Sequence, residues 1–260
     1  MLQDERVSAE RALRRARVSA YAPAQYVEQE SFMLAGEILE LGRRAGIAPG
    51  VRVLDLCCGV AGPGRFLTRE LGCAYLGVDA SADAIAIARE RAGKLPCRFE
   101  VRGVPPLPGE SYDVMLLLET MLAFCDKAPL VKAIGSALPA GGRFAFTLEE
   151  GAPLSSSERD LMPDADTVWP VPLEEMLGLL SRAGLVVTFR EDRTPAHRAV
   201  ASALVEAFVR ERTSIAARIG TRAVDELIAG HRLWSEWLAC GRVRKFALVA
   251  EKASGWSAHA

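Results

Sequence analysis

The feature that most constrains the fold is an apolar run that contains an acidic residue and leads into a turn of small residues. The run is Val53-Leu54-Asp55-Leu56, and the turn is Cys57-Cys58-Gly59-Val60-Ala61-Gly62-Pro63-Gly64. A helical pattern follows over residues 65–71, so the stretch predicts a strand, a loop and a helix. A second apolar run ends in Asp79, 20 residues after Gly59. Nucleotide-binding sheets keep an acid for the ribose hydroxyls at this spacing, so a nucleoside-bearing cofactor is expected at the carboxyl end of a parallel sheet.

The same alternation of strand and helix patterns continues along most of the chain and predicts a doubly wound α/β sheet. Strands are expected at residues 51–56, 74–79, 97–101, 114–118, 143–148, 185–190 and 243–249. Helices are expected at residues 3–18, 29–45, 82–92, 126–138 and 173–183. Residues 195–239 are nearly all helical in pattern, with a break at Gly220, and therefore insert about two helices before the final strand.

Composition limits the classes of partner. The 260 residues are 50% hydrophobic, which is enough for a sizeable core, and carry a formal net charge of −1. No overall field therefore recruits nucleic acid or an anionic membrane. The sequence has no apolar run of the ~18 residues that a membrane span needs and no secretory leader pattern, so a cytoplasmic protein is expected. The six cysteines form no C-x-x-C, and no Cys/His pair has zinc spacing, so reduced thiols and no metal site are expected.

The glycine spacing separates the candidate cofactors. From Gly59 the chain reads G-V-A-G-P-G, which misses the G-x-G-x-x-G of dinucleotide sites. It resembles instead the first motif of class I S-adenosylmethionine-dependent methyltransferases, an apolar run followed by Asp-x-Gly-x-Gly-x-Gly. Asp55 matches the acid and Gly59 the central glycine, whereas Cys57 and Ala61 stand where that family more often has glycine. Asp79 matches the family's ribose-binding acid, and the resemblance covers roughly residues 30–190 and 243–249.

The resemblance implies a Rossmann-like, mostly parallel sheet of seven strands whose last strand is antiparallel. It also implies that insertions before this strand form a substrate lid. The expected organisation is an N-terminal helical or lid segment at residues 1–28, a cofactor-binding core at 29–194 and 241–252, and a helical lid at 195–240. A monomer or a homodimer that takes a small-molecule substrate is expected, without a nucleic-acid or membrane partner.

Residues that would bind S-adenosylmethionine follow from the same resemblance. The loop is expected around the methionine portion, Asp55 near its ammonium, and Asp79 on the ribose. Ala80 or Ser81 would flank the adenine, and backbone groups of Gly103 and Val104 would replace an acid that the family often has there. Tyr21 and Tyr26 would close the methionine end. The full predicted set is Tyr21, Asp55, Cys57, Cys58, Gly59, Ala61, Gly62, Asp79, Ala80, Ser81, Gly103, Val104 and Glu119.

Three residues are candidates for work on the nucleophile, as a base or as an orienting acceptor. Glu119 ends a strand that should be central, where ligands bind in such sheets. His231 titrates near neutral pH, and Tyr26 is the third candidate. His197 is a further, weaker candidate, because a histidine near a helix start is more often solvated.

Substrate contacts are expected from Tyr26, Glu149, His231 and Trp234. Glu149 and Glu150 are adjacent, so they would either both bind a polar group or point one inward and one outward. His231, Trp234 and Trp237 share a helical face, which is either core packing or a cavity wall.

These patterns favour methyl transfer to a small aromatic or mostly apolar metabolite of natural-product type. Two alternatives stay open: a nicotinamide-dependent oxidoreductase, and a cofactor-binding protein of the same fold without catalysis. The residues do not determine whether oxygen, nitrogen or carbon would be methylated, because a fold does not fix a substrate.

Overall fold

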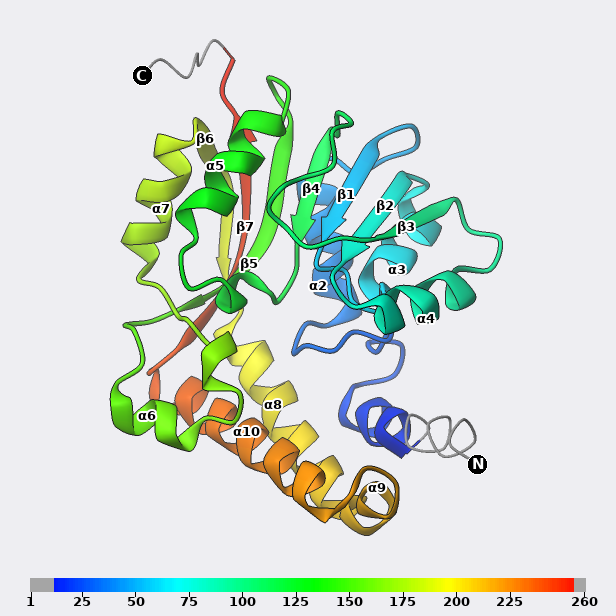
Figure 1. Cartoon of the computed structure of the whole chain (residues 1–260), viewed down its shortest axis with the longest axis vertical. Coiled ribbons are helices and arrows are strands. Elements are labelled where there is room, and N and C mark those ends of the chain that lie inside the picture. Colours follow the sequence, from blue (N-terminus) through cyan, green and yellow to red (C-terminus); the bar gives the residue numbers. More distant parts are fainter. Residues whose placement is uncertain (1–11, 255–260) are drawn as a thin grey trace.

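A twisted sheet of seven strands forms the centre of the protein in the computed structural model, which describes residues 12–254 (Figure 1). The strand order is β3-β2-β1-β4-β5-β7-β6, and only β7 runs antiparallel to its neighbours. The strands are β1 Arg52–Leu56, β2 Ala74–Asp79, β3 Cys97–Val101, β4 Val114–Leu117, β5 Arg143–Glu150, β6 Leu185–Asp192 and β7 Arg244–Lys252. The sequence-based prediction of a mostly parallel sheet with an antiparallel last strand is therefore confirmed.

Helices cover both faces of this sheet, because successive strand residues bury apolar side chains on opposite sides. Leu54 and Leu56 of β1 pack with α5 and α7, whereas Val53 packs with α2 and α4. The helices of the core are α2 Ala35–Arg44, α3 Gly62–Leu71, α4 Ala82–Ala92, α5 Ala128–Ala137 and α7 Leu173–Arg182. The short α6 Ser156–Leu161 and the 3-10 turns η1 Met121–Ala123 and η2 Ala165–Thr167 lie between β4 and α7 and were not predicted.

The helix predicted at residues 29–45 is shorter than its apolar pattern suggests, because α2 begins only at Ala35. The buried amide of Gln29 holds the preceding segment in an irregular path. It accepts a hydrogen bond from the Val27 N–H at 2.6 Å and donates to the Met33 carbonyl at 2.8 Å. These bonds satisfy backbone groups that a helix would otherwise pair, so residues 28–31 form an irregular segment, with a left-handed backbone at Glu28, beside the carboxyl edge of the sheet.

Three helices between β6 and β7, together with helical residues 12–20, form a second apolar cluster beside the sheet edge (Figure 1). They are α8 Thr194–Arg210, α9 Arg212–Ile219 and α10 Thr221–Cys240. Gly220 breaks the run as predicted, with a φ of 89°, but the insertion holds three helices where about two were expected. The first part of the predicted helix 3–18 lies outside the described residues. Among the helices of residues 12–254, none combines the length and hydropathy of a membrane span.

Gly64 on α3 offers a test of how tightly this helix packs on β2. A Cβ at Gly64 would lie 2.1 Å from the Tyr75 hydroxyl, whereas one at Gly36 on α2 would lie 3.6 Å from its nearest neighbour. Gly64→Ala should destabilise the protein by about 1–3 kcal/mol through overpacking. Gly36→Ala should be neutral or stabilising, because alanine is the better helix former. Urea unfolding measures both, and equal stabilities of the two variants would contradict this packing.

Candidate active site

Two adjoining cavities lie at the carboxyl edge of the sheet. The first, which we call the loop cavity, has a volume of about 220 Å³ and borders the loop after β1. The second, the lid cavity, has a volume of about 210 Å³ and lies beneath α8 and α10. Four residues line both cavities: Gln29, Glu30, Ser31 and Glu119. Anything bound in one cavity therefore lies next to anything bound in the other.

The loop between β1 and α3 has an unusual backbone. Cys57, Gly59 and Ala61 have φ values of 56°, 54° and 55°, in the left-handed region that favours glycine. Cys57 and Ala61 are the two positions where the resembled family more often has glycine, so the backbone conformation accounts for that preference. Beside Gly59, a Cβ would have no atom within 4 Å. The space over the middle of the loop is therefore open to a ligand.

Asp55 presents a buried carboxyl group to the loop cavity. It is 3% exposed and accepts a hydrogen bond from the Tyr75 hydroxyl at 2.6 Å. Burial raises the pKa of Asp55 to about 7, although the bond from Tyr75 opposes the shift. A cationic group in the loop cavity would stabilise the ionised form and lower this pKa.

Asp79 holds the loop in place. Its two carboxylate oxygens accept from the Gly59 N–H at 2.9 Å and the Ser81 N–H at 2.8 Å. Each oxygen keeps a second lone pair for another donor. Ser81 caps α4 by accepting from the Ala84 N–H at 3.1 Å. The loop cavity is not lined by the residues expected to contact the adenosine, which are Asp79, Ala80, Ser81, Gly103 and Val104. Their contacts with the adenosine stay a prediction.

The predicted loop residues do line the loop cavity, and the thiols there are not reactive. Burial raises the pKa of Cys57 to about 12 and also raises the pKa of Cys58. Both side chains therefore act as small neutral groups at pH 7. The lining includes the predicted residues Asp55, Cys57, Cys58, Gly59, Ala61, Gly62 and Glu119.

Glu119 lies at the junction of the two cavities, where β4 ends. Its φ of 58° is rare for a residue with a side chain. The Glu119 N–H donates to the Thr147 hydroxyl at 2.5 Å, which fixes this turn of the backbone. Such strain at the rim of a cavity is typical of a functional position.

Lys245 on β7 was missed by the sequence analysis and is central to the site. Its ammonium donates to Glu119 Oε2 at 2.7 Å and to Glu149 Oε1. Antiparallel pairing of β5 with β7 sets Lys245 directly opposite Glu149. The only sequence signal for it is a lysine directly before the apolar run at residues 246–250.

The pKa directions of Lys245 and Glu119 both favour the ionised forms. Burial alone would lower the pKa of Lys245, but the charges of Glu119 and Glu149 outweigh burial and raise it. Burial alone would raise the pKa of Glu119, but Lys245 and His197 outweigh it and lower that pKa. Glu149 is 1% exposed, while Glu150 pairs with Arg244 at the surface. Of the two sequence-based alternatives, one inward and one outward acid is the correct one.

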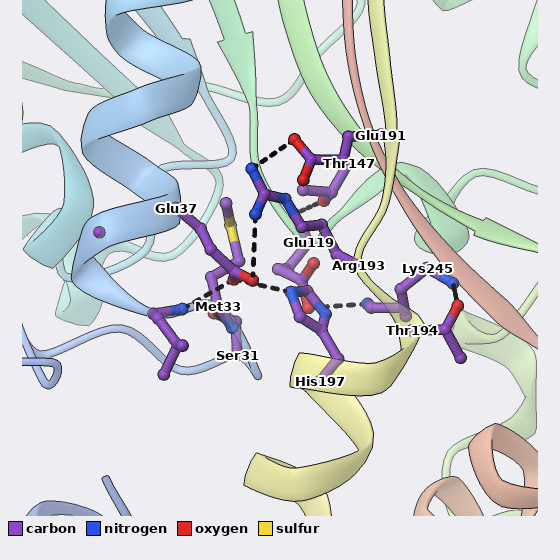
Figure 2. A network of polar contacts seen from close by, with 12 residues as sticks. Ser31, Met33, Glu37, Glu119, Thr147, Glu191, Arg193, Thr194, His197 and Lys245 are labelled. Atoms are coloured by element: carbon purple, nitrogen blue, oxygen red, sulfur yellow. Dashed lines mark hydrogen bonds and ion pairs between the residues drawn. The ribbon is translucent and has the colours of Figure 1, made fainter. Parts of the chain in front are cut away.

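A second network joins the start of the lid to the core. His197, on the first turn of α8, pairs with Glu37 of α2 at 3.0 Å, and Figure 2 shows both residues near Glu119. Arg193 pairs with Glu40 at 2.6 Å. The expectation that His197 is solvated is wrong, because it is 1% exposed. Periodicity could not reveal this, since the partner lies 160 residues away.

The aromatic helical face of α10 is divided between the cavity and the core. His231 and Trp234 line the lid cavity. Trp237 packs instead into a small apolar cluster with Met162 and Val243. The His231 Nδ1–H donates to the Leu227 carbonyl at 2.8 Å, which leaves Nε2 as an acceptor. Burial lowers the pKa of His231 below 6.5, so the imidazole is neutral at pH 7.

Of the two tyrosines predicted at the front, only Tyr21 lines the lid cavity. Tyr26 packs against Tyr21 with the rings tilted by 44° and their centroids 5.3 Å apart, and it lines neither cavity. Other lining residues that the sequence analysis missed are Arg17, Gln29, Glu30, Ser31, Phe32, Leu122 and Leu204. They come from turns and from helices whose packing the sequence pattern does not reveal.

Replacing Lys245 tests whether it is the partner that keeps the two carboxylates ionised. Lys245→Met should destabilise the protein by about 3–5 kcal/mol, because two buried carboxylates lose their cation. Their pKa values in the folded variant then rise above the unfolded values, so stability is lost as pH rises. The defect should be smaller near about pH 5 than near about pH 8. Arg244→Met, which removes a surface pair, is the control with a small effect. Thermal unfolding across pH measures this, and a pH-independent defect would contradict it.

Comparisons with known proteins agree with this geometry. The family described as "Methyltransferase domain" matches residues 53–142. Phosphoethanolamine N-methyltransferase 1 of Zea mays is 25% identical over 218 residues, which are 82% of this chain and 44% of that protein. The chain thus spans less than half of the length of that relative.

Solved structures share the fold. The cyclopropane synthase MmaA2 of Mycobacterium tuberculosis has a TM-score of 0.80 at 14% identity, covering 97% of this chain and 98% of that one. Phosphoethanolamine N-methyltransferase 2 of Haemonchus contortus, in complex with S-adenosyl-L-methionine, has a TM-score of 0.77 at 21% identity, covering 92% of this chain and 56% of that one. These matches agree with the resemblance of the sequence motifs to class I methyltransferases: residues 53–142 match a methyltransferase domain, and S-adenosylmethionine is the cofactor of that family.

Proposed function

We propose that this protein transfers a methyl group from S-adenosylmethionine to a small metabolite with an aromatic or mostly apolar body. The observation that carries the proposal is the shared lining of the two cavities at Gln29, Glu30, Ser31 and Glu119. A cofactor in the loop cavity and a substrate in the lid cavity would meet there. Holding two reactants together in this way can lower a barrier by ~7–11 kcal/mol.

The residues of the loop cavity fit the cofactor. Asp55 is a buried acid that lacks a cationic neighbour among residues 12–254 and would pair with the methionine ammonium. The open space beside Gly59 admits the chain of the methionine portion. Asp79, Ala80, Ser81, Gly103 and Val104 would hold the ribose and adenine. When bound, the cofactor supplies an electrophilic methyl group on a sulfonium.

The lid cavity supports a division of roles between Glu119 and His231. Glu119 Oε2 is bound by Lys245 and the pKa of Glu119 is lowered, which makes it a weak base. We assign it the role of an acceptor that orients the nucleophile. His231 is neutral, with Nε2 as an acceptor, and is the better candidate for a base. We propose that residues 12–28 and 195–240 form the lid that excludes water, with the aromatic wall at Tyr21, Phe32 and Trp234.

Calorimetry tests the cofactor assignment. S-adenosylhomocysteine should bind and raise thermal stability, whereas NAD should not bind. Asp55→Asn should weaken S-adenosylhomocysteine binding by about 10- to 100-fold near about pH 8, because it removes a charged partner. Wild-type affinity should fall as pH drops through 7, since Asp55 then becomes protonated. The variant should lose this dependence.

Asp55→Asn should also stabilise the protein against unfolding in the absence of cofactor. The pKa of Asp55 is raised by folding, so its ionisation destabilises the folded state as pH rises toward 7. Asp113→Asn, at an exposed position of the surface pair with Arg52, is the control for cofactor binding. Tight binding of NAD without binding of S-adenosylhomocysteine would overturn the cofactor assignment.

Turnover measured as S-adenosylhomocysteine release at saturating cofactor tests the assignment of a base. The acid limb of the wild-type pH profile should have an apparent pKa below 6.5, because protonated His231 cannot accept a proton. His231→Ala should lower turnover by ~10²–10⁴-fold and abolish that limb. Glu119→Gln should lower turnover by ~10²-fold or more only if Glu119 is the base. Tyr26→Phe should have little effect. Near-wild-type turnover in all three variants would mean that no base is used.

A further inference from the structure

The lid cavity holds more negative than positive charge. Its lining includes two cations, Arg17 and Lys245, and three carboxylates, Glu30, Glu119 and Glu149, while His231 is neutral. Among the side chains that line the cavity, the carboxylates therefore outnumber the cations by one.

Two carboxylate oxygens of these lining residues lack a hydrogen-bond donor among the described residues. Within residues 12–254, Glu119 Oε1 and Glu149 Oε2 are buried and have no hydrogen-bond partner, although both residues line the cavity. Their other oxygens are both bound by Lys245. Leaving a charged acceptor buried without a donor is costly. The site is therefore built to receive a hydrogen-bond donor, and a positively charged donor would also balance the charge.

The walls beside these oxygens suit a cation with apolar substituents. Phe32 and Trp234 line the cavity, and the Lys245 ammonium lies 5.7 Å and 6.0 Å from the centres of their rings. Aromatic rings attract cations at such distances and also bury the carbon atoms around an ammonium. Tyr21 and Leu204 complete an apolar surface.

The same cavity is poorly suited to a phosphate. Arg17 is paired with Glu30 at 2.6 Å, and Lys245 is held by two carboxylates. Among the described residues that line the cavity, no cation is left for a phosphate. A phosphate would also be repelled by Glu119 and Glu149.

We propose that the lid cavity recognises a small amine without an anionic group, bound as its ammonium by Glu119 and Glu149 within the aromatic wall. This deepens the proposed function, on which it rests, by naming the substrate class. Phosphoethanolamine, for which the curated relative is named, would then be excluded.

Calorimetry on protein saturated with S-adenosylhomocysteine tests the recognition without turnover. The probes are phenethylamine, its neutral counterpart 2-phenylethanol, and phosphoethanolamine. Phenethylamine should bind about ten-fold or more tightly than the alcohol, because only the amine gives the carboxylates charged donors. Phosphoethanolamine should bind more weakly than phenethylamine. Equal binding of amine and alcohol, tighter binding of phosphoethanolamine, or no binding of phenethylamine would overturn the proposal.

Neighbouring acids on β5 provide a matched pair of variants. Glu149→Gln should weaken phenethylamine binding by about ten-fold or more and leave 2-phenylethanol unchanged, because it removes one charged acceptor. Glu150→Gln, which alters only the surface pair with Arg244, should change neither. Thermal unfolding and S-adenosylhomocysteine binding verify that each variant is folded. If Glu149→Gln does not fold, the comparison of the three probes on the wild-type protein still tests whether the cavity recognises an amine. Equal effects of the two variants on phenethylamine would contradict the assignment.

Release of S-adenosylhomocysteine from S-adenosylmethionine, measured with a panel of primary and secondary amines, alcohols and phosphoethanolamine, separates this proposal from the proposed function. Amines that bind but never yield product would overturn methyl transfer and leave the recognition intact. Product formed only with alcohols or with phosphoethanolamine would keep methyl transfer and overturn amine recognition.

Discussion

The ammonium of Lys245 is buried, and the carboxylates of Glu119 and Glu149 compensate for its lost hydration. Such a cluster is stable only when every charge keeps a partner. One cation shared by two acids leaves two buried acceptor oxygens without a donor among residues 12–254, on side chains that line the lid cavity. The cluster also depends on the antiparallel direction of β7. This pairing sets Lys245 opposite Glu149 and within hydrogen-bond distance of Glu119 at the end of β4.

Backbone strain is concentrated around the same cavities. Cys57, Ala61 and Glu119 all have left-handed backbone conformations, which side chains disfavour by about 1–2 kcal/mol each. Hydrogen bonds fix both segments: Asp79 accepts from the loop at Gly59, and the Thr147 hydroxyl accepts from the Glu119 N–H. Strain of this kind persists where the shape of a binding surface requires it. The loop can therefore approach a ligand closely, and Glu119 can face both cavities.

The helices proposed as a lid are joined to the core by charges and held together by apolar packing. His197 and Arg193 at the start of α8 pair with Glu37 and Glu40 of α2. Farther along, α8, α10 and helical residues 12–20 bury their own cluster, which includes Phe208. The wall of the lid cavity at His231 and Trp234 thus belongs to a unit with its own core, so its side chains can change while the sheet is kept.

The sequence by itself determined the sheet, its order of elements, and the loop after β1, because these depend on local periodicity and on residues close together in the chain. It also identified Glu119, His231 and Trp234 as candidates, since each ends a strand or shares a helical face. It did not determine the partner of Glu119, the burial of His197 or the absence of Tyr26 from the cavity lining. Lys245 lies 126 residues from Glu119, and His197 lies 160 residues from Glu37. Contacts of this range depend on strand register and on how the lid helices dock. Only the tertiary structure decided which charges meet, because the free energy of burying a charge depends on partners that the chain brings together by folding.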